Sequence, residues 1–366
     1  MSLRIMIVGG GTGGHVIPGL AIARELREHY SAEVLFVGTA RGMETRLVPK
    51  AGFPLELIRV GQLKNVSAIT RIKTLTDLPR SIVQAAQLLR RWKPDAAISV
   101  GGYASGPGAL AALALRVPLV AFEPNYVAGF ANRRIARFVA AAGVQFEQTA
   151  RAFRNGEVTG VPIRREFFEV PPLADSPAAN LLIFGGSQGA RAINQAVVAA
   201  LPQLAAQLPQ LRIVHQTGPK DLESTRAAYN NLPAGTRLAS CEVLEFIDDM
   251  PCRFADATVV LCRSGASTVA EIAAAGRVGV FVPLPTAADD HQTKNAEAFV
   301  QKRAGELLPQ SQLSAESLTQ TLIRLFSLEH RAYLAETGQN ARGLARPDAA
   351  QRIAEMAAKA ALRSRA

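Results

Sequence analysis

The stretch GGGTGGH at residues 9–15 combines main-chain amides that can face an anion with an imidazole that can transfer a proton. Gly9, Gly11 and Gly14 fit the spacing G-x-G-x-x-G, which is typical of a phosphate-binding turn between a strand and a helix. His15 follows the loop at the start of the expected helix, where the helix dipole favours the neutral imidazole. The chemistry expected here is binding of a phosphorylated ligand, with His15 as a candidate general base.

The flanking residues predict the elements that hold this loop. LRIMIV (3–8) is predicted to be a buried parallel strand, and HVIPGLAIARELREH (15–29) carries apolar residues at helical spacing. The next strand, EVLFVG (33–38), ends in Gly38 and Thr39, so no carboxylate follows it to bind an adenosine ribose. This favours a phosphorylated ligand other than NAD. The alternative is a tight strand–helix turn that binds nothing.

Three further glycine-rich stretches follow apolar strands. They are SVGGYASGPG (99–108), the GGSQG within residues 181–201, and CRSGAST (262–268). The chain has neither the GxxxxGK[ST] sequence of a nucleoside-triphosphatase nor a DxD triplet that would hold a divalent metal over a diphosphate. We therefore expect no metal and no cofactor, with helix N-termini and arginines offsetting the charge of a leaving group.

Strands alternate with helical patterns along the chain, which predicts an α/β fold with parallel sheets. We expect two Rossmann-like, doubly wound domains facing across a cleft, at residues 1–163 and 164–346, with a proline-containing linker at 158–177. The helical segment in residues 347–366 is expected to pack back on the first domain. The strands are expected near residues 3–8, 33–37, 55–59, 95–100, 118–122, 138–142, 181–185, 211–216, 236–243, 257–261, 279–282 and 305–308.

The net charge of +11 comes almost entirely from the first half of the chain. Residues 1–163 hold 20 Lys or Arg and 10 Asp or Glu, whereas residues 164–366 hold 21 and 20. A basic half can face nucleic acid, anionic lipid or a phosphorylated substrate. No nucleic-acid-binding module is recognisable, so we expect no nucleic acid as a partner.

The composition, with 48% hydrophobic residues, is that of a globular protein. No apolar run reaches the length needed to cross a bilayer, and no signal peptide is evident. Cys241, Cys252 and Cys262 lack CxxC spacing and lie in or near apolar strands. They are expected to be buried, reduced thiols rather than metal ligands.

Six blocks, in this order, closely resemble the bacterial peptidoglycan N-acetylglucosaminyltransferases. They are GGTGGH (10–15), GGYASGPG (101–108), GGSQGA (185–190), FIDDM (246–250), CRSGASTVAEIAAAG (262–276) and DDHQTKNA (289–296). The resemblance covers almost the whole chain and implies the GT-B fold. It implies inverting, metal-independent transfer of GlcNAc from UDP-GlcNAc to the C4 hydroxyl of MurNAc in undecaprenyl-pyrophosphoryl-MurNAc-pentapeptide. It leaves open partners in a cell-wall synthesis complex.

The resemblance implies a set of residues for UDP-GlcNAc, bound mainly by the second domain. Ser187 and Arg164 would contact the diphosphate, and the backbone of Ile247 would receive the uracil edge. Glu271 would accept both ribose hydroxyls, although a carboxylate near a helix N-terminus can also be there for the dipole. Asn125 and Gln292 would contact the GlcNAc moiety. The remaining donor contacts implied are Thr12, Gly13, Gly14, Ala266, Ser267, Thr268, Val269 and Ala270.

The chain departs from the family pattern at two places. FEPN (122–125) stands where the family often has HEQN, which puts an acceptor-binding role of Phe122 and Pro124 in doubt. His291 precedes Gln292 where some relatives have two glutamines. His15 is either the general base or a residue that only positions the acceptor pyrophosphate or caps the loop.

Other activities stay open at this stage. One is another GT-B enzyme, such as a sterol or antibiotic glycosyltransferase or a UDP-GlcNAc 2-epimerase. Another is a protein without catalytic activity that binds nucleotide sugars or polyanions.

A polyprenyl-linked acceptor implies a peripheral protein on the cytoplasmic face of the bacterial inner membrane. Residues 59–91 combine cations with apolar side chains, as expected of an anchor on an anionic membrane surface. The alternative is an amphipathic helix whose apolar face lies in the core. The cations are Arg59, Lys64, Arg71, Lys73, Arg80, Arg90 and Arg91 against the single acid Asp77, and the apolar residues are Ile69, Ile72, Leu75, Leu78 and Ile82.

Overall fold

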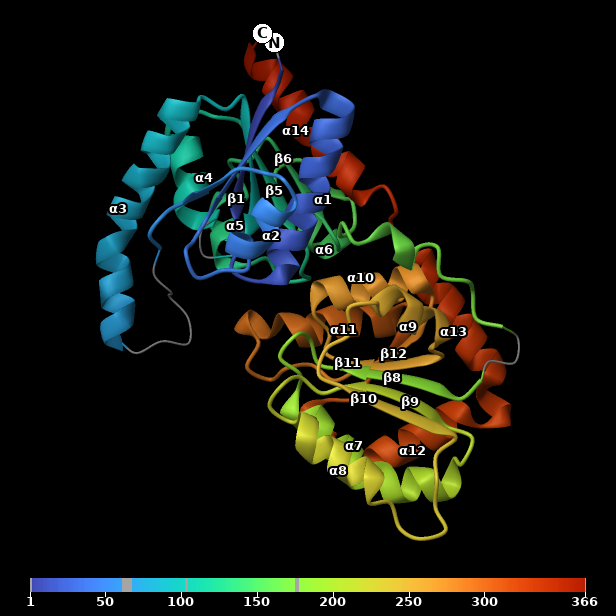
Figure 1. The fold of residues 1–366 in the computed structure, drawn as a ribbon. Coiled ribbons are helices and arrows are strands. Elements are labelled where there is room, and N and C mark those ends of the chain that lie inside the picture. Colours follow the sequence, from blue (N-terminus) through green and yellow to red (C-terminus); the bar gives the residue numbers. More distant parts are fainter. Residues whose placement is uncertain (1, 61–67, 103–104, 175–177, 366) are drawn as a thin grey trace. The chain divides into compact units, whose positions relative to one another are not determined.

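The computed structural model of the chain describes residues 2–60, 68–102, 105–174 and 178–365. Of residues 68–76 it describes the backbone alone. It divides into two compact units. Unit 1 comprises Met1–Arg164 and Arg346–Ala366, and unit 2 comprises Arg165–Ala345. Each unit has an α/β architecture built on one parallel sheet (Figure 1).

Unit 1 has a seven-stranded sheet in the order β3-β2-β1-β4-β5-β6-β7. Its strands are β1 (Arg4–Gly9), β2 (Glu33–Gly38), β3 (Leu55–Leu57), β4 (Ala96–Gly101), β5 (Leu119–Glu123), β6 (Ala141–Val144) and β7 (Gly156–Val158). Its helices are α1 (Gly13–Tyr30), α2 (Glu44–Lys50), α3 (Ala68–Trp92), α4 (Ser105–Ala114), α5 (Phe130–Ile135), α6 (Glu147–Ala150) and α14 (Ala349–Arg365).

Unit 2 has a six-stranded sheet in the order β10-β9-β8-β11-β12-β13. Its strands are β8 (Asn180–Phe184), β9 (Arg212–Gln216), β10 (Ser240–Leu244), β11 (Val259–Cys262), β12 (Val278–Phe281) and β13 (Gly305–Leu307). Its helices are α7 (Arg191–Gln207), α8 (Leu222–Asn230), α9 (Met250–Asp256), α10 (Ala266–Ala275), α11 (His291–Gln301), α12 (Ala315–Phe326) and α13 (Arg331–Gly343), with the short 3-10 turns η1 (Arg165–Phe167), η2 (Ala288–Asp290), η3 (Gln310–Gln312) and η4 (Leu328–His330).

Near-continuous apolar runs form the central strands because both faces of each sheet are covered by helices. In β1, Ile5, Met6, Ile7 and Val8 are all at most 1% exposed. In β11, the run Val259–Cys262 is completely buried. These runs are the centres of two separate cores, one for each unit.

The C-terminal helix α14 packs on unit 1, against α1, β4, β5 and β6. Figure 1 shows this helix, in red, beside the blue α1. Ile353, Ala357 and Ala361 of α14 are fully buried. Arg365 donates to both carboxylate oxygens of Asp95 and to the Ser2 carbonyl. The last turn is therefore fastened to the amino ends of β1 and β4.

The segment expected to be a linker, residues 158–177, is more tightly packed than that interpretation implied. Phe167 is completely buried, and its ring centroid lies 5.1 Å from that of Phe254. The buried guanidinium of Arg277 donates to the Pro171 carbonyl at 3.0 Å. Apolar side chains between the prolines thus attach the start of unit 2 to its own core.

Two of the three cysteines are not buried, contrary to expectation. Cys262 lies in the central strand β11 and is buried, and burial raises the pKa of its thiol. Cys241 lies on the edge strand β10 and Cys252 on the short helix α9, and both are exposed. An apolar neighbourhood in sequence did not imply burial because an edge strand and a surface helix each present one face to solvent.

Candidate active site

Both sheets have a topological switch point, at which the strand order reverses. In unit 1, β1 lies between β2 and β4, and in unit 2, β8 lies between β9 and β11. At such a point the connections leave in opposite directions, and ligands of doubly wound sheets bind at the carboxyl ends of the strands there. The two candidate half-sites therefore lie after β1 and β4 and after β8 and β11.

The glycine loop after β1 needs glycine for two separate reasons. Gly9, Gly10 and Gly11 have φ angles of 146°, 149° and 96°, which side chains rarely adopt. A Cβ on Gly9 would also lie 2.5 Å from the Gly101 carbonyl oxygen. Gly13 and Gly14, by contrast, already belong to α1, and the N-cap residue Thr12 makes no side-chain capping bond. The amides of His15 and Val16 donate to the Thr12 carbonyl, so those of Gly13 and Gly14 are the ones that can serve a ligand.

His15 is oriented by the neighbouring strand β4. Its Nδ1 lies 2.9 Å from the Val100 carbonyl oxygen. A carbonyl can only accept a hydrogen bond, so Nδ1 carries the proton, and in the neutral ring Nε2 holds the lone pair. Gly101 makes room for the ring, since a Cβ there would lie 2.8 Å from Nδ1. The half-buried imidazole thus has the tautomer that a general base requires.

Asn125, after β5, is held by a buried carboxylate that the sequence interpretation did not single out. Glu123 is 3% exposed, and its Oε1 accepts from the Asn125 backbone amide and from Asn125 Nδ2, both at 3.1 Å. Its Oε2 accepts from Gly129 N at 2.8 Å and from Asn132 Nδ2 at 3.0 Å. Phe122 is fully buried and Pro124 is buried, so neither side chain presents a surface to an acceptor.

In unit 2, predicted site residues follow three neighbouring strands. Ser187 lies exposed in the loop after β8, the run Ala266–Glu271 begins α10 after β11, and Gln292 lies at the start of α11 after β12. The side chains of Val269 and Ala270 pack in the core. Of the run on α10, only Ser267, Thr268 and Glu271 therefore present more than a methyl group at the surface.

Glu271 lies too far from the N-terminus of α10 for a strong interaction with the helix dipole. The helix begins at Ala266 and has no acidic residue in its first turn. Because the dipole effect falls off within that turn, it gives little reason for a carboxylate at Glu271. The contact of Glu271 with the ribose hydroxyls stays a prediction.

Gln292 has one end of its amide already engaged. Its Oε1 accepts from the Leu284 backbone amide at 3.0 Å, so the side-chain nitrogen is the donor it can offer to a sugar hydroxyl. Ser264 donates to the Gln292 carbonyl at 2.9 Å, and Asn295 Nδ2 donates to the Ser264 carbonyl at 3.1 Å. These two completely buried side chains join α11 to the loop after β11.

Three predicted residues remain: Ile247, His291 and Arg164. Ile247 follows the edge strand β10 and is 5% exposed, so only its backbone can meet a ligand. His291 Nδ1 lies 2.6 Å from the Ala288 carbonyl oxygen, so this ring nitrogen donates to the backbone. Arg164 is exposed and is the last residue of the first segment of unit 1. Its contact with the diphosphate stays a prediction.

A buried polar network behind the Ser187 loop was also missed. Asn194 of α7 donates through Nδ2 to the Thr217 carbonyl and to Asp221, both at 2.9 Å, and its Oδ1 lies 3.1 Å from His215 Nε2. His215 Nδ1 in turn lies 3.2 Å from the Tyr229 hydroxyl. Burial lowers the pKa of His215 to about 4. The network ties α7, β9 and α8 together around a neutral imidazole.

Across the described ranges, no three His, Cys, Asp or Glu side chains are grouped so that they could hold a metal ion. Nor does any helix within those ranges have the length and apolarity needed to cross a membrane.

Two parallel-sheet units, each with its glycine-rich loops at a switch point, define a glycosyltransferase of the GT-B class. Two family profiles match, namely the glycosyltransferase family 28 N-terminal domain at residues 5–144 and the C-terminal domain at residues 180–353. The chain belongs to glycosyltransferase family 28, among the UDP-N-acetylglucosamine–N-acetylmuramyl-(pentapeptide) pyrophosphoryl-undecaprenol N-acetylglucosamine transferases.

Three similar proteins illustrate this assignment. The transferase of that name from Geotalea uraniireducens is 40% identical over 96% of this chain and 97% of its own. That of Solibacter usitatus is 43% identical over 96% and 94%. The crystal structure of Acinetobacter baumannii MurG matches with a TM-score of 0.81 and 35% identity over 98% of this chain and 99% of its own.

Proposed function

We propose that the protein transfers GlcNAc from UDP-GlcNAc to the C4 hydroxyl of MurNAc in undecaprenyl-pyrophosphoryl-MurNAc-pentapeptide, with inversion from α to β. The observation that carries the mechanism is the hydrogen bond from His15 Nδ1 to the Val100 carbonyl. It leaves Nε2 as the proton acceptor at the switch point of unit 1. The names of the relatives support the choice of both substrates.

In the proposed reaction His15 Nε2 takes the proton of the acceptor hydroxyl as its oxygen attacks the anomeric carbon of GlcNAc. The bond between that carbon and the diphosphate oxygen breaks, and the electron pair leaves with UDP. The transition state has oxocarbenium character, so stabilising the departing diphosphate lowers the barrier. Ser187 and Arg164 are proposed to do this without a metal ion or other cofactor.

The donor is proposed to be recognised mainly by unit 2. The ribose hydroxyls would be accepted by Glu271 and the uracil edge by the backbone of Ile247. Gln292 would donate its side-chain amide to GlcNAc. Asn125 of unit 1 would contact the same sugar. The other proposed contacts are Thr12, Gly13, Gly14, Ser267 and Thr268, with Ala266, Val269 and Ala270 taking part through their backbone.

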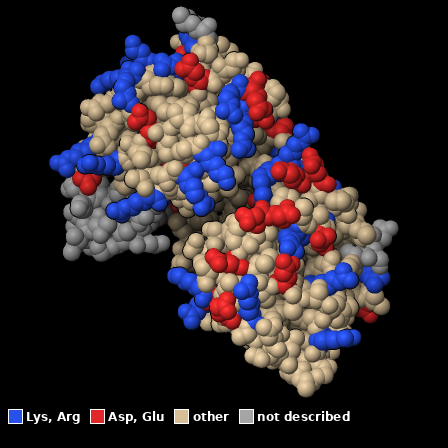
Figure 2. Space-filling view, viewed as in Figure 1, with Lys and Arg blue, Asp and Glu red and all other residues tan. Residues whose placement is uncertain are grey.

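The acceptor has a polyprenyl tail, so the protein is proposed to dock on the cytoplasmic face of the inner membrane. Unit 1 holds 26 Lys or Arg and 12 Asp or Glu, whereas unit 2 holds 15 and 18. Figure 2 shows blue Lys and Arg groups over the visible face of unit 1. This charge favours anionic lipid.

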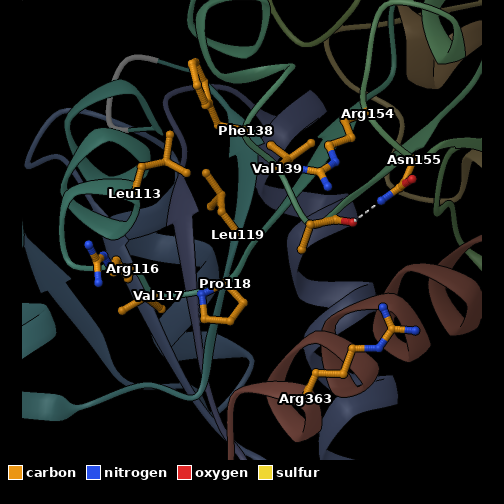
Figure 3. Close-up of a pocket in the computed structure, with 11 residues that line it drawn as sticks. Leu113, Arg116, Val117, Pro118, Leu119, Phe138, Val139, Arg154, Asn155 and Arg363 are labelled. Carbon is orange, nitrogen blue, oxygen red and sulfur yellow. Dashed lines mark hydrogen bonds between the residues drawn. The ribbon is translucent and has the colours of Figure 1, made fainter.

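Of the anchor predicted at residues 59–91, the apolar residues Ile69, Ile72 and Leu75 and the cations Lys64, Arg71 and Lys73 lie outside the described side chains. In the described part of α3, Ile82 packs against the core. The described surface adds a second candidate, a hollow of about 500 Å³ at the amino ends of β5 and β6 (Figure 3). Phe138, which is 68% exposed, lines this hollow together with Arg116, Arg154 and Arg363. An apolar side chain among cations is suited to an anionic interface.

The decisive experiment is to measure UDP release from UDP-GlcNAc with and without lipid-linked MurNAc-pentapeptide. We expect release only when the acceptor is present, together with a β-1,4-linked disaccharide product. Release of UDP with an acceptor of another class, or conversion of UDP-GlcNAc into its epimer, would indicate a different GT-B enzyme. Binding of UDP-GlcNAc with no turnover under any condition would indicate a binding protein. Pull-down with other cell-wall enzymes tests whether the protein has partners in a cell-wall synthesis complex.

A further inference from the structure

Glu44, at the start of α2, is a carboxylate hidden beneath the glycine loop of unit 1. It is 1% exposed, and Glu123 is the only other buried carboxylate among the described residues. Burying a carboxylate costs free energy unless hydrogen bonds replace its hydration. No salt bridge within the described parts of the chain involves Glu44. Its position therefore calls for an explanation other than a buried ion pair.

Three hydrogen bonds hold this carboxylate. Gly11 N donates to Oε2 at 2.7 Å, while Thr39 N and Thr39 Oγ1 donate to Oε1 at 2.8 and 3.0 Å. An ionised carboxylate is an acceptor on both oxygens, which matches three donors. A glutamine at position 44 would turn its N–H₂ group toward one of these donors, and that hydrogen bond would be lost.

Three glycines make room for the same group. A Cβ on Gly10 would lie 2.5 Å from the Glu44 carboxyl carbon, and one on Gly38 would lie 2.5 Å from its Cγ. A Cβ on Gly42 would lie 1.9 Å from Oε2. The loop after β1, the end of β2 and the turn before α2 are thus all shaped around one side chain.

Glu44 does not replace the acidic residue that is missing after the second strand. In a dinucleotide-binding fold, an acidic residue at the end of the second strand accepts a ribose hydroxyl. Here β2 ends without one, and Glu44 of α2 accepts from Thr39, the residue that follows β2. Its oxygens are engaged by Gly11 and Thr39, so it faces the protein and not a sugar.

We propose that Glu44 is a positioning residue that sets the conformation of the GGGTGGH loop. Gly11 is held at both ends, because its amide donates to Glu44 and its carbonyl accepts from Met43 N at 3.3 Å. The next residue is Thr12, the N-cap of α1. Fixing Gly11 therefore fixes the direction in which the uncapped amides and His15 enter the switch point. This inference rests on the proposed function insofar as the loop serves the transfer reaction.

The first test compares wild type with Glu44→Gln, and with Glu28→Gln as the control, an exposed carboxylate on α1 of the same unit. We expect Glu44→Gln to lower kcat by about 100-fold through misplacement of the loop. UDP affinity, measured by calorimetry, should fall far less than kcat, because uracil and ribose are assigned to Ile247 and Glu271 of unit 2, whereas only Thr12, Gly13 and Gly14 of the donor contacts lie in the loop. Wild-type kcat in Glu44→Gln would overturn the proposal, and so would a parallel loss in Glu28→Gln.

The second test uses hydrogen–deuterium exchange of residues 9–16, which needs no activity. We expect this segment to exchange at least tenfold faster in Glu44→Gln, with unit 2 unchanged. If wild type fails to transfer GlcNAc while this difference is seen, the proposed function fails and the positioning role of Glu44 stands. Equal exchange in the two proteins would overturn the positioning role.

Two further variants keep the proposal testable if Glu44→Gln does not fold. Thr39→Val removes one donor to the carboxylate and should lower kcat by roughly threefold to tenfold, with faster exchange of residues 9–16. Gly42→Ala should displace the Glu44 carboxylate and lower kcat. In a double variant with Glu44→Ala, it should lower kcat little further, because the carboxylate is already absent. If the losses in Gly42→Ala and Glu44→Ala are additive, the two substitutions do not act through the same carboxylate, which would contradict the proposal. A Thr39→Val variant with the kcat and exchange rates of wild type would also contradict it.

Discussion

At the scale of single residues, the orientation of His15 determines a testable kinetic signature. His15→Ala should lower kcat by about 10²–10⁴, because the proton of the attacking hydroxyl loses its acceptor. The fall in kcat toward acidic pH should also vanish from the pH–rate profile. A variant that keeps this acidic limb would assign the base to another residue and leave His15 a binding role.

Glu271 and Gln292 should separate nucleotide binding from sugar binding. Glu271→Ala should weaken UDP and UDP-GlcNAc alike, by about 1.5–3 kcal/mol, since a charged acceptor for ribose is lost. Titration calorimetry with both ligands measures this change. An unchanged KM with a collapsed kcat would contradict the assignment.

Gln292→Ala should instead relax the choice of sugar and leave the affinity for free UDP intact. In the wild type the Gln292 side-chain oxygen Oε1 accepts from Leu284 N, so the substitution removes the side-chain nitrogen that donates to the sugar. Kinetics with UDP-GlcNAc and UDP-GalNAc, set beside the binding of UDP alone, check this prediction. Equal losses for UDP and the donor would argue against a sugar contact.

What the sequence could predict at this scale depends on how local the cause is. Gly9 and Gly11 were identifiable because a positive φ is a property of one residue. Glu44 and Glu123 were not, since four of the seven donors to their carboxylates are backbone amides, which every sequence contains. Their roles become visible only when the fold brings these amides to them.

At the scale of secondary structure, the network around His215 predicts how stability varies with pH. Its pKa is about 4 in the folded protein, against an ordinary value of 6.5. As the pH falls through this range, the unfolded chain binds a proton that the folded protein does not. Stability is therefore lost between pH 6.5 and pH 4, by roughly 3 kcal/mol from this group.

Urea unfolding at several pH values tests this dependence. His215→Gln should be less stable than wild type at pH 7 and should lose less stability on acidification. Tyr229→Phe keeps the buried histidine and should keep a slope of the wild-type sign. A slope in His215→Gln equal to that of wild type would assign the effect to other groups.

Element positions were predictable where the apolar pattern is long. The strands expected near 3–8, 33–37 and 95–100 lie within one residue of β1, β2 and β4 at each end. The strand expected at 138–142 was displaced, since β6 covers Ala141–Val144, and β7 was not anticipated. β7 has only three residues, Gly156–Val158, with no buried side chain. Its sequence GEV has one large apolar residue and so shows no apolar pattern, whereas the equally short β3 begins the apolar stretch LELIRV (55–60).

At the scale of the whole molecule, transfer activity should persist in excess EDTA. The reason is the missing DxD triplet, together with helix N-termini at both switch points that can offset the leaving-group charge. Turnover measured after chelation and gel filtration tests this. Activity that disappears and returns with Mg²⁺ or Mn²⁺ would reveal a metal requirement.

Membrane docking should depend on unit 1 and on salt. The protein should sediment with anionic vesicles more than with neutral ones, and Phe138→Ser should weaken this binding. Leu328→Ser is the matched control, because Leu328 is 72% exposed but lies in unit 2. Both variants should still bind UDP. Equal sedimentation of Phe138→Ser and wild type would show that Phe138 is not part of the membrane anchor. The variant Ile69/Ile72/Leu75→Ser would then test the segment at residues 59–91.

The return of α14 to unit 1 has a consequence for how the protein is made. A ribosome must translate Arg165–Ala345 between the last strand of unit 1 and the helix that covers β4, β5 and β6. At about 5–20 residues per second, this takes roughly 10–40 s. Unit 2 is continuous in sequence and can fold during that interval. The nascent unit 1 waits with β4, β5 and β6 exposed where α14 will cover them, and at this stage a chaperone or a protease can reach those strands.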